Sequence, residues 1–134
     1  MSLINWSESM HIGCQELDYD HEKFAEVINN LHEAIENKSN HDDLEDAVED
    51  LVEYTEWHFR HEERLMLQSG YELMEDHKQV HEGFTAKVNE IRGDLVGGGE
   101  KATMILSTLV ADWASHLVNG DKPMCEYLAE LENA

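Results

Sequence analysis

The chain has little proline, little cysteine and no long apolar run, and each shortage excludes a class of structure. Its 134 residues include one proline, Pro123, so long helices are permitted, because a proline inside a helix breaks it. No stretch of 18 apolar residues occurs, and we therefore expect no transmembrane helix. The first ten residues lack the basic and apolar segments of a secretory signal peptide, so we expect a cytoplasmic location.

The two cysteines, Cys14 and Cys125, lie near opposite ends of the sequence. In a reducing compartment such residues are expected to be free thiols. A bridge between them stays open as an alternative, because the two ends of a bundle with an even number of helices can meet.

Positive charge is also scarce: 9 Lys and Arg stand against 30 Asp and Glu, for a formal net charge of −21. Such a surface repels phosphate backbones and anionic lipids, so nucleic acids and membrane surfaces are excluded as partners. The charge is best interpreted as a solubility feature, and a basic protein partner is the alternative. The length fits a single domain over residues 1–134.

Apolar residues recur with helical period in four segments, which predicts an all-α protein. The segments cover residues 19–37, 41–69, 73–96 and 100 to 119 or 121. Asp18 is the predicted N-cap of the first helix, and Ser39 with Asp42 forms an approximate capping box for the second. Gly70 is the predicted end of the second helix.

Short loops between four such helices predict an antiparallel up-down-up-down four-helix bundle. Residues 1–17 lack a sustained period and are expected to form an N-terminal arm, with Trp6 anchored on the bundle. Residues 123–134 are expected to form a short C-terminal segment, in which Pro123 suits a first helical position.

In each of the four predicted helices, polar residues interrupt the row of apolar residues, and they do so at similar levels along the bundle axis. Five histidines and two carboxylates are involved: His21, His58, Glu62, His77, His81, His116 and Asp121. In an antiparallel bundle with ~1.5 Å rise per residue, most of them fall within about 10–15 Å of one end. The sequence therefore predicts one polar cluster inside the bundle.

Spacing within the helices supports this cluster, because His58–Glu62 and His77–His81 are four residues apart and share a face. His116 and Asp121 are five apart, a turn of about 140° on a straight helix. Either the helix loosens at Asn119-Gly120, or Asp121 reaches sideways to a second ion.

Burying five imidazoles and two carboxylates without partners costs several kcal/mol or more. A metal centre removes that conflict by making each buried polar group a ligand. Imidazole and carboxylate suit iron, zinc, copper or nickel. Seven ligands exceed the needs of one ion, so we expect two ions that share the carboxylates. Iron is favoured, because a vacant coordination position is functional on a redox-active metal.

The residues around these ligands resemble those of the hemerythrin family, and of bacteriohemerythrin-like domains in particular. The resemblance runs from Trp6 to about Leu128. Its matching stretches are Asp18-Tyr19-Asp20-His21, His58-Phe59-Arg60-His61-Glu62-Glu63, His77-Lys78-Gln79-Val80-His81, and Trp113-Ala114-Ser115-His116 followed by Asp121. The resemblance implies two iron ions with an oxo or hydroxo bridge, and reversible binding of O₂.

Carried over residue by residue, the resemblance implies a role for each ligand. His77, His81 and His116 would hold the coordinatively full iron, and His21 and His58 the open one. Glu62 and Asp121 would bridge both irons. Two departures from the family stand out: Asp20 replaces the usual Gln before the first ligand, and Gly120 and Pro123 fall where the family often continues helically.

An apolar wall around the irons would exclude water. Its candidate members are Phe24, Ala25, Ile28, Phe59, Met66, Trp113 and Leu117. Four histidines remain, and His11, His32, His41 and His61 are expected to be surface or incidental residues. His61 lies about 60° from His58 around its helix, so a role in contacting the metal ligands from behind is the alternative for this residue.

These observations favour an O₂ carrier, store or sensor that is not an enzyme. The alternatives are a di-iron enzyme acting on peroxide or nitric oxide, and a module that responds to O₂ or redox state. Di-iron carboxylate oxidases use two Glu-x-x-His pairs within a bundle. The only such pair here is Glu8 with His11, outside the predicted helices, which argues against that class. The sequence does not indicate the oligomeric state.

Overall fold

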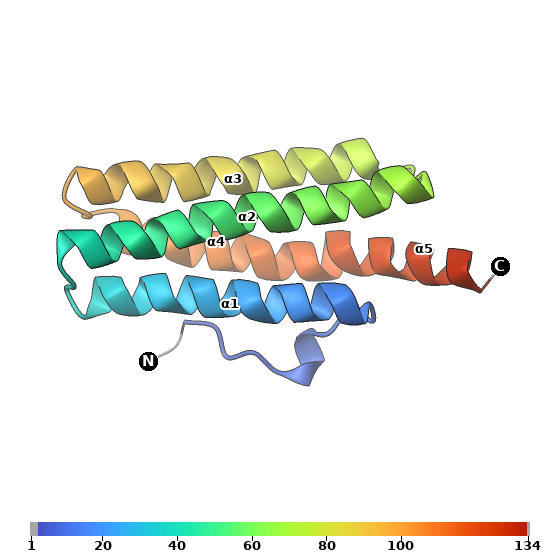
Figure 1. Ribbon diagram of the computed structural model, residues 1–134, viewed down its shortest axis with the longest axis horizontal. Coiled ribbons are helices and arrows are strands. Elements are labelled where there is room, and N and C mark those ends of the chain that lie inside the picture. The colour runs from blue at the N-terminus through green and yellow to red at the C-terminus, as the bar shows by residue number, and fades with distance from the viewer. Residues whose placement is uncertain (1–2, 134) are drawn as a thin grey trace.

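The computed structural model describes residues 3–133, and over that range the chain is helical with no strand (Figure 1). Four helices lie side by side in a bundle, with the N-terminal arm along α1 and the last helix, α5, continuing α4. The elements are η1 (Glu8–Met10), α1 (Gln15–Glu36), α2 (His41–Ser69), α3 (Met74–Val96), α4 (Ala102–His116), η2 (Leu117–Asp121) and α5 (Lys122–Glu132). The predicted four-helix bundle is confirmed.

The bounds of α2 agree with the prediction, but its capping residue does not. The side chain of Asn40 accepts a hydrogen bond from the backbone N–H of Asp43 at 2.9 Å. The predicted capping box of Ser39 and Asp42 is therefore wrong, because Asn40 is the N-cap residue and its side chain pairs with a free N–H group of the first turn. Gly70 ends the helix in the left-handed region at φ 70°, as predicted.

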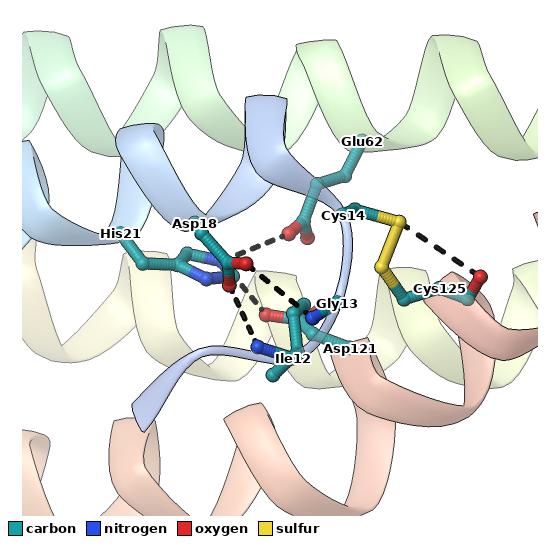
Figure 2. The surroundings of a disulfide bond; sticks show 8 residues. All are labelled: Ile12, Gly13, Cys14, Asp18, His21, Glu62, Asp121 and Cys125. Carbon is teal, nitrogen blue, oxygen red and sulfur yellow. Dashed lines mark hydrogen bonds and ion pairs between the residues drawn. A yellow bond between two sulfur atoms is a disulfide. The ribbon is translucent and has the colours of Figure 1, made fainter. Parts of the chain in front are cut away.

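Helix α1 begins four residues before the predicted start, at Gln15, so Asp18 is not its N-cap. The Asp18 carboxylate lies inside the helix and reaches back toward the arm. It accepts hydrogen bonds from the backbone N–H groups of Ile12 at 2.7 Å and Gly13 at 3.3 Å (Figure 2). Those two N–H groups precede the helix. Because Asp18 accepts their hydrogen bonds, the helix can start before the predicted residue 19.

The fourth helix does not end at residue 119 or 121. It widens into a π-helical turn, η2, and continues as α5, so the C-terminal segment is an extension of the bundle (Figure 1). Pro123 lies at the start of α5, where a missing backbone N–H is tolerated.

Ile4 and Trp6 hold the first part of the arm against the bundle. Ile4 exchanges two hydrogen bonds with the side chain of Asn29, both at 2.8 Å. The ring of Trp6 lies 6.3 Å from that of Trp113, between centroids, so the predicted anchoring role of Trp6 is confirmed. Trp113 itself belongs to the main apolar core between the four helices, together with Phe24 and Leu109.

Cys14 and Cys125 form a disulfide, so the expectation of free thiols is wrong (Figure 2). Cys14 directly precedes α1 and Cys125 lies in the first turn of α5, and their Cα atoms are 5.8 Å apart. Within residues 3–133, none of the helices combines the length and apolarity needed to cross a membrane. The cytoplasmic location stays a prediction.

Candidate metal centre

The structure brings all seven predicted ligands together near one end of the bundle. They come from α1, α2, α3, α4 and η2, and each side chain is at least nine-tenths buried. Their helices place them there because each occupies a position in the inward-facing stripe that an apolar residue would otherwise fill. The predicted convergence of these side chains is confirmed.

Glu62 lies at the centre of the cluster and divides it. One carboxylate oxygen, Oε2, faces the Nε2 atoms of His58 at 3.0 Å and His21 at 3.3 Å. The other oxygen, Oε1, faces Nε2 of His81 at 2.9 Å and of His77 at 3.3 Å. The carboxylate therefore spans two separate groups of imidazoles.

Asp121 also faces both groups of imidazoles, and it adds His116 to the second group. Its Oδ2 lies 3.1 Å from Nε2 of His21, and its Oδ1 lies 3.0 Å from Nε2 of both His77 and His116. All five histidines thus present the same ring nitrogen to the two carboxylates. In Figure 2, dashed lines join the His21 ring to both Glu62 and Asp121.

Two overlapping sets of ligand atoms result, each with all atoms within 4.8 Å of one another. One set holds Glu62, His77, His81, His116 and Asp121, and the other holds His21, His58, Glu62 and Asp121. The two carboxylates belong to both sets. The arrangement fits two adjacent ions, one with three imidazoles and one with two.

Unsatisfied polar atoms test whether these residues fit a metal. Among the described residues, six buried side-chain atoms have no hydrogen-bond partner: Nδ1 of His21, Nδ1 and Nε2 of His58, Nε2 of His81, Nε2 of His116 and Oδ1 of Asp121. Leaving such atoms unpaired costs roughly 1–3 kcal/mol each. Four of the six point into the cluster, so a cation there satisfies them.

The π-helical turn explains how His116 and Asp121 meet although they are five residues apart. In a π turn the backbone hydrogen bond spans five residues, here from the N–H of Lys122 to the carbonyl of Leu117, so such residues share a face. The first of the two sequence alternatives, a loosened helix at Asn119-Gly120, is confirmed.

Gly120 allows the His116 ring to lie against this turn. A Cβ atom built on Gly120 would lie 2.5 Å from both Cε1 and Nδ1 of His116, which is closer than real contacts permit. The sequence suggested only that Gly120 interrupts the helix. The structure gives it a second effect, because the missing side chain is the space that the ring occupies.

The charges inside the cluster shift the pKa of its members. Burial alone lowers the pKa of His58, but Glu62 and the contacts with Asp20 and Asp121 raise it to about 10. Burial opposes charge on His77 as well, yet Asp121 and Glu62 raise its pKa to about 9. Burial raises the pKa of Glu62, but His58 and His21 hold it well below its usual range. The pocket thus strongly favours positive charge.

A second carboxylate lies behind each of two ligand histidines. Oδ2 of Asp20 lies 3.5 Å from Nδ1 of His58, and Oε2 of Glu63 lies 3.1 Å from Nδ1 of His81. Sequence reasoning flagged Asp20 as a departure and missed Glu63. Glu63 directly follows the ligand Glu62 in the sequence, and that position could have indicated a residue close to the metal centre.

His61 is not incidental, so that expectation is wrong. Its Nδ1 lies 2.7 Å from Oδ2 of Asp20, and its Nε2 lies 2.6 Å from Oε1 of Glu16. The other three histidines lie outside the cluster: His11 and His41 are exposed, and His32 is half-buried beside Glu36.

Aromatic and aliphatic side chains enclose the cluster as predicted. The Phe59 ring stacks on His81 with centroids 3.8 Å apart, and the Phe24 ring meets His58 edge-on at 5.7 Å. Trp113 lies 6.1 Å from the His21 ring. All seven candidate wall residues, Phe24, Ala25, Ile28, Phe59, Met66, Trp113 and Leu117, are buried.

Comparison with known proteins agrees with this geometry. The model of the hemerythrin HHE cation binding domain matches residues 13–126. A bacteriohemerythrin of Pseudomonas aeruginosa is 35% identical over 122 residues, covering 90% of this chain and 78% of that protein. A bacteriohemerythrin of Stenotrophomonas maltophilia is 32% identical over 121 residues, with the same coverage of 90% and 78%.

Two more distant relatives extend the comparison. Myohemerythrin-1 of Phascolopsis gouldii is 29% identical over 93 residues, which is 69% of this chain and 72% of that protein. The crystal structure of a leucine-to-tyrosine mutant of hemerythrin superposes with a TM-score of 0.83 at 22% identity. It covers 96% of this chain and 98% of the other, so the fold is shared.

Proposed function

The chain belongs to the hemerythrin family, and from this premise we propose that it binds O₂ reversibly at a pair of non-haem iron ions. The observation that carries the proposal is the division of the ligands into two sets that share Glu62 and Asp121. When bound, two ferrous ions supply the electrons for reversible O₂ binding. The role is that of a carrier, store or sensor rather than of an enzyme that turns over a substrate.

The ligand sets support an assignment of each side chain. His77, His81 and His116 would hold one ion, and His21 and His58 would hold the other. Glu62 and Asp121 reach both, because each turns one oxygen toward each set. The two-histidine set has one protein ligand fewer than the other. That difference would leave room for O₂ on the side of His21 and His58.

The surrounding residues keep water away from that position. Phe24 and Ile28 are fully buried beside His21 on α1, and Trp113 packs against the same ring from α4. Water and protons promote irreversible oxidation, so a dry wall favours release of O₂ over loss of the ferrous state. The apolar wall therefore supports binding without turnover.

The optical spectrum of the iron-loaded protein tests this function. We expect two iron ions per chain and visible charge-transfer bands that appear with O₂ and fade when O₂ is removed. Zinc in place of iron, or oxidation that does not reverse, would count against O₂ binding. Turnover of peroxide or nitric oxide well above the rate of free iron would favour an enzyme instead.

A variant pair localises the O₂ position. His21→Ala removes a ligand of the two-histidine set, so we expect loss of the O₂-dependent bands. His41→Ala is the matched control, because His41 lies exposed at the start of α2. If the bands survive unchanged in His21→Ala, the assignment of the open position is wrong.

A further inference from the structure

The back of the His58 ring faces a buried carboxylate. Nε2 of His58 points into the metal centre, 3.0 Å from Glu62, while Nδ1 points toward Oδ2 of Asp20 at 3.5 Å. Among the described residues Nδ1 makes no hydrogen bond, and Oδ2 of Asp20 is the carboxylate oxygen that faces it. Asp20 is itself buried, with 4% of its surface exposed.

Asp20 is held in place by contacts from α2. His61 Nδ1 lies 2.7 Å from the same oxygen, Oδ2, and the far nitrogen of His61 contacts Glu16 at 2.6 Å. The hydroxyl of Tyr54 donates a hydrogen bond to the backbone carbonyl of Asp20 at 2.8 Å. Side chain and backbone of Asp20 are thus both fixed between α1 and α2.

We propose that Asp20 and His61 are positioning residues for His58: His61 holds the Asp20 carboxylate beside His58 Nδ1, so that the carboxylate accepts a hydrogen bond from that nitrogen when Nε2 binds the metal. This inference rests on the proposed di-iron function. It goes beyond the ligands, because neither residue belongs to the two ligand sets.

The physical reason is the protonation pattern of a metal-bound imidazole. A histidine that binds a metal through Nε2 carries its proton on Nδ1, and that N–H needs an acceptor when buried. Asp20 supplies the acceptor. Such partners fix the ring orientation, and their loss typically weakens metal binding by about 10–100-fold.

His61 prevents the carboxylate from turning outward. A surface groove of about 940 Å³ lies between α1 and α2, and its lining includes Asp20, His61, Tyr19, Trp57 and Arg60. Without the His61 ring, the Asp20 carboxylate is free to turn into this groove and be solvated. The His58 N–H would then lose its acceptor although Asp20 is still present.

The three-histidine set has its own carboxylate behind a ligand, which provides an internal comparison for the test. Glu63 lies 3.1 Å from Nδ1 of His81, and His81 belongs to the three-histidine set. Asp20 and Glu63 therefore serve different ions. Loss of Asp20 should affect the two-histidine ion, whereas loss of Glu63 should affect its neighbour.

Anaerobic titration of the metal-free protein with Co²⁺, followed by visible absorption, tests the proposal. We expect wild type to bind two Co²⁺ ions. In Asp20→Ala, we expect one of the two to bind 10–100-fold more weakly. In Asp20→Asn, most of that loss should be recovered, because the amide oxygen still accepts a hydrogen bond. His61→Ala should weaken the same ion to an intermediate extent.

Proton NMR of the Co²⁺-loaded protein identifies the affected histidine. The exchangeable Nδ1–H resonance of His58 should exchange faster with water in Asp20→Ala and His61→Ala, while that of His81 is unchanged. In Glu63→Ala the pattern should reverse. Glu22→Ala is the matched control, because Glu22 also neighbours His21 on α1 but is exposed.

Unchanged Co²⁺ affinities in Asp20→Ala, with a folded protein by circular dichroism, would overturn the proposal. So would equal weakening in Asp20→Ala and Asp20→Asn, since it would show that the charge rather than the hydrogen bond matters. A wild-type protein that takes up neither Co²⁺ nor Fe²⁺ would instead overturn the proposed function itself.

Discussion

Nε2 of His116 lies 3.0 Å from Oδ1 of Asp121, although the two residues are five positions apart on one continuous helical segment. A regular α-helix would turn them about 140° from each other. The π-helical turn removes that angle, and the bare backbone of Gly120 leaves space for the His116 ring. The local irregularity of the helix is therefore part of the metal centre.

Gly120→Ala should disturb the centre through this contact. The added methyl group would lie 2.5 Å from the His116 ring, so the ring must leave its position. We expect the three-histidine ion to bind about tenfold more weakly, which corresponds to ~1.4 kcal/mol. Iron analysis after dialysis against a chelator measures this loss.

Gly83→Ala is the matched control for that experiment. Gly83 and Gly120 both line a surface groove between α3 and α4, but a Cβ atom on Gly83 meets nothing within 4 Å. We expect unchanged iron content and a gain of about 0.5–1 kcal/mol in the free energy of unfolding, because alanine favours helix. Equal iron retention in both variants would show that the Gly120 contact is unimportant.

Removing the disulfide should lower stability markedly. It links residues 111 positions apart, and chain-entropy arguments give about 2–5 kcal/mol for such a long loop. Urea unfolding of Cys14→Ser, compared with wild type under oxidising conditions, measures the loss. Reduced wild type should match the variant; if reduction leaves the unfolding midpoint unchanged, the bridge does not contribute.

The metal-free protein should lose stability as pH rises above neutrality. The pKa values of His58 and His77, about 10 and 9, exceed the ordinary value of 6.5. Their stabilising contribution is therefore fully present below pH 6.5 and is lost as pH rises through about 9 to 10. Urea midpoints from pH 6.5 to 10 measure this decline.

His58→Gln provides the comparison, because it removes one of the two titrating groups while keeping a polar side chain of similar length. Its unfolding midpoint should fall less steeply with pH than that of wild type. Identical slopes would contradict the assignment of the pH dependence to His58.

The sequence predicted the bundle and the convergence of the seven side chains because both follow from periodicity. His58 with Glu62, and His77 with His81, share helix faces at four-residue spacing, and Gly70 marks the end of α2. Such signals are local. The structure then brings the faces together through packing that any amphipathic bundle requires.

Features that depend on contacts between distant segments were not predictable in the same way. Asp18 is a good N-cap residue by type, but its carboxylate reaches back to the arm instead. The pairing of Cys14 with Cys125 depends on α4 continuing through η2 into α5, whereas Gly120 and Pro123 are residues that commonly interrupt a helix. His61 was underestimated because its partners, Asp20 and Glu16, lie on another helix.

Anomalous diffraction at the iron edge, from crystals loaded anaerobically with ferrous ions, tests the central claim most directly. We predict two anomalous peaks between Glu62 and Asp121, one within bonding distance of His77, His81 and His116 and one within bonding distance of His21 and His58. A single peak, or density away from these side chains, would contradict the account.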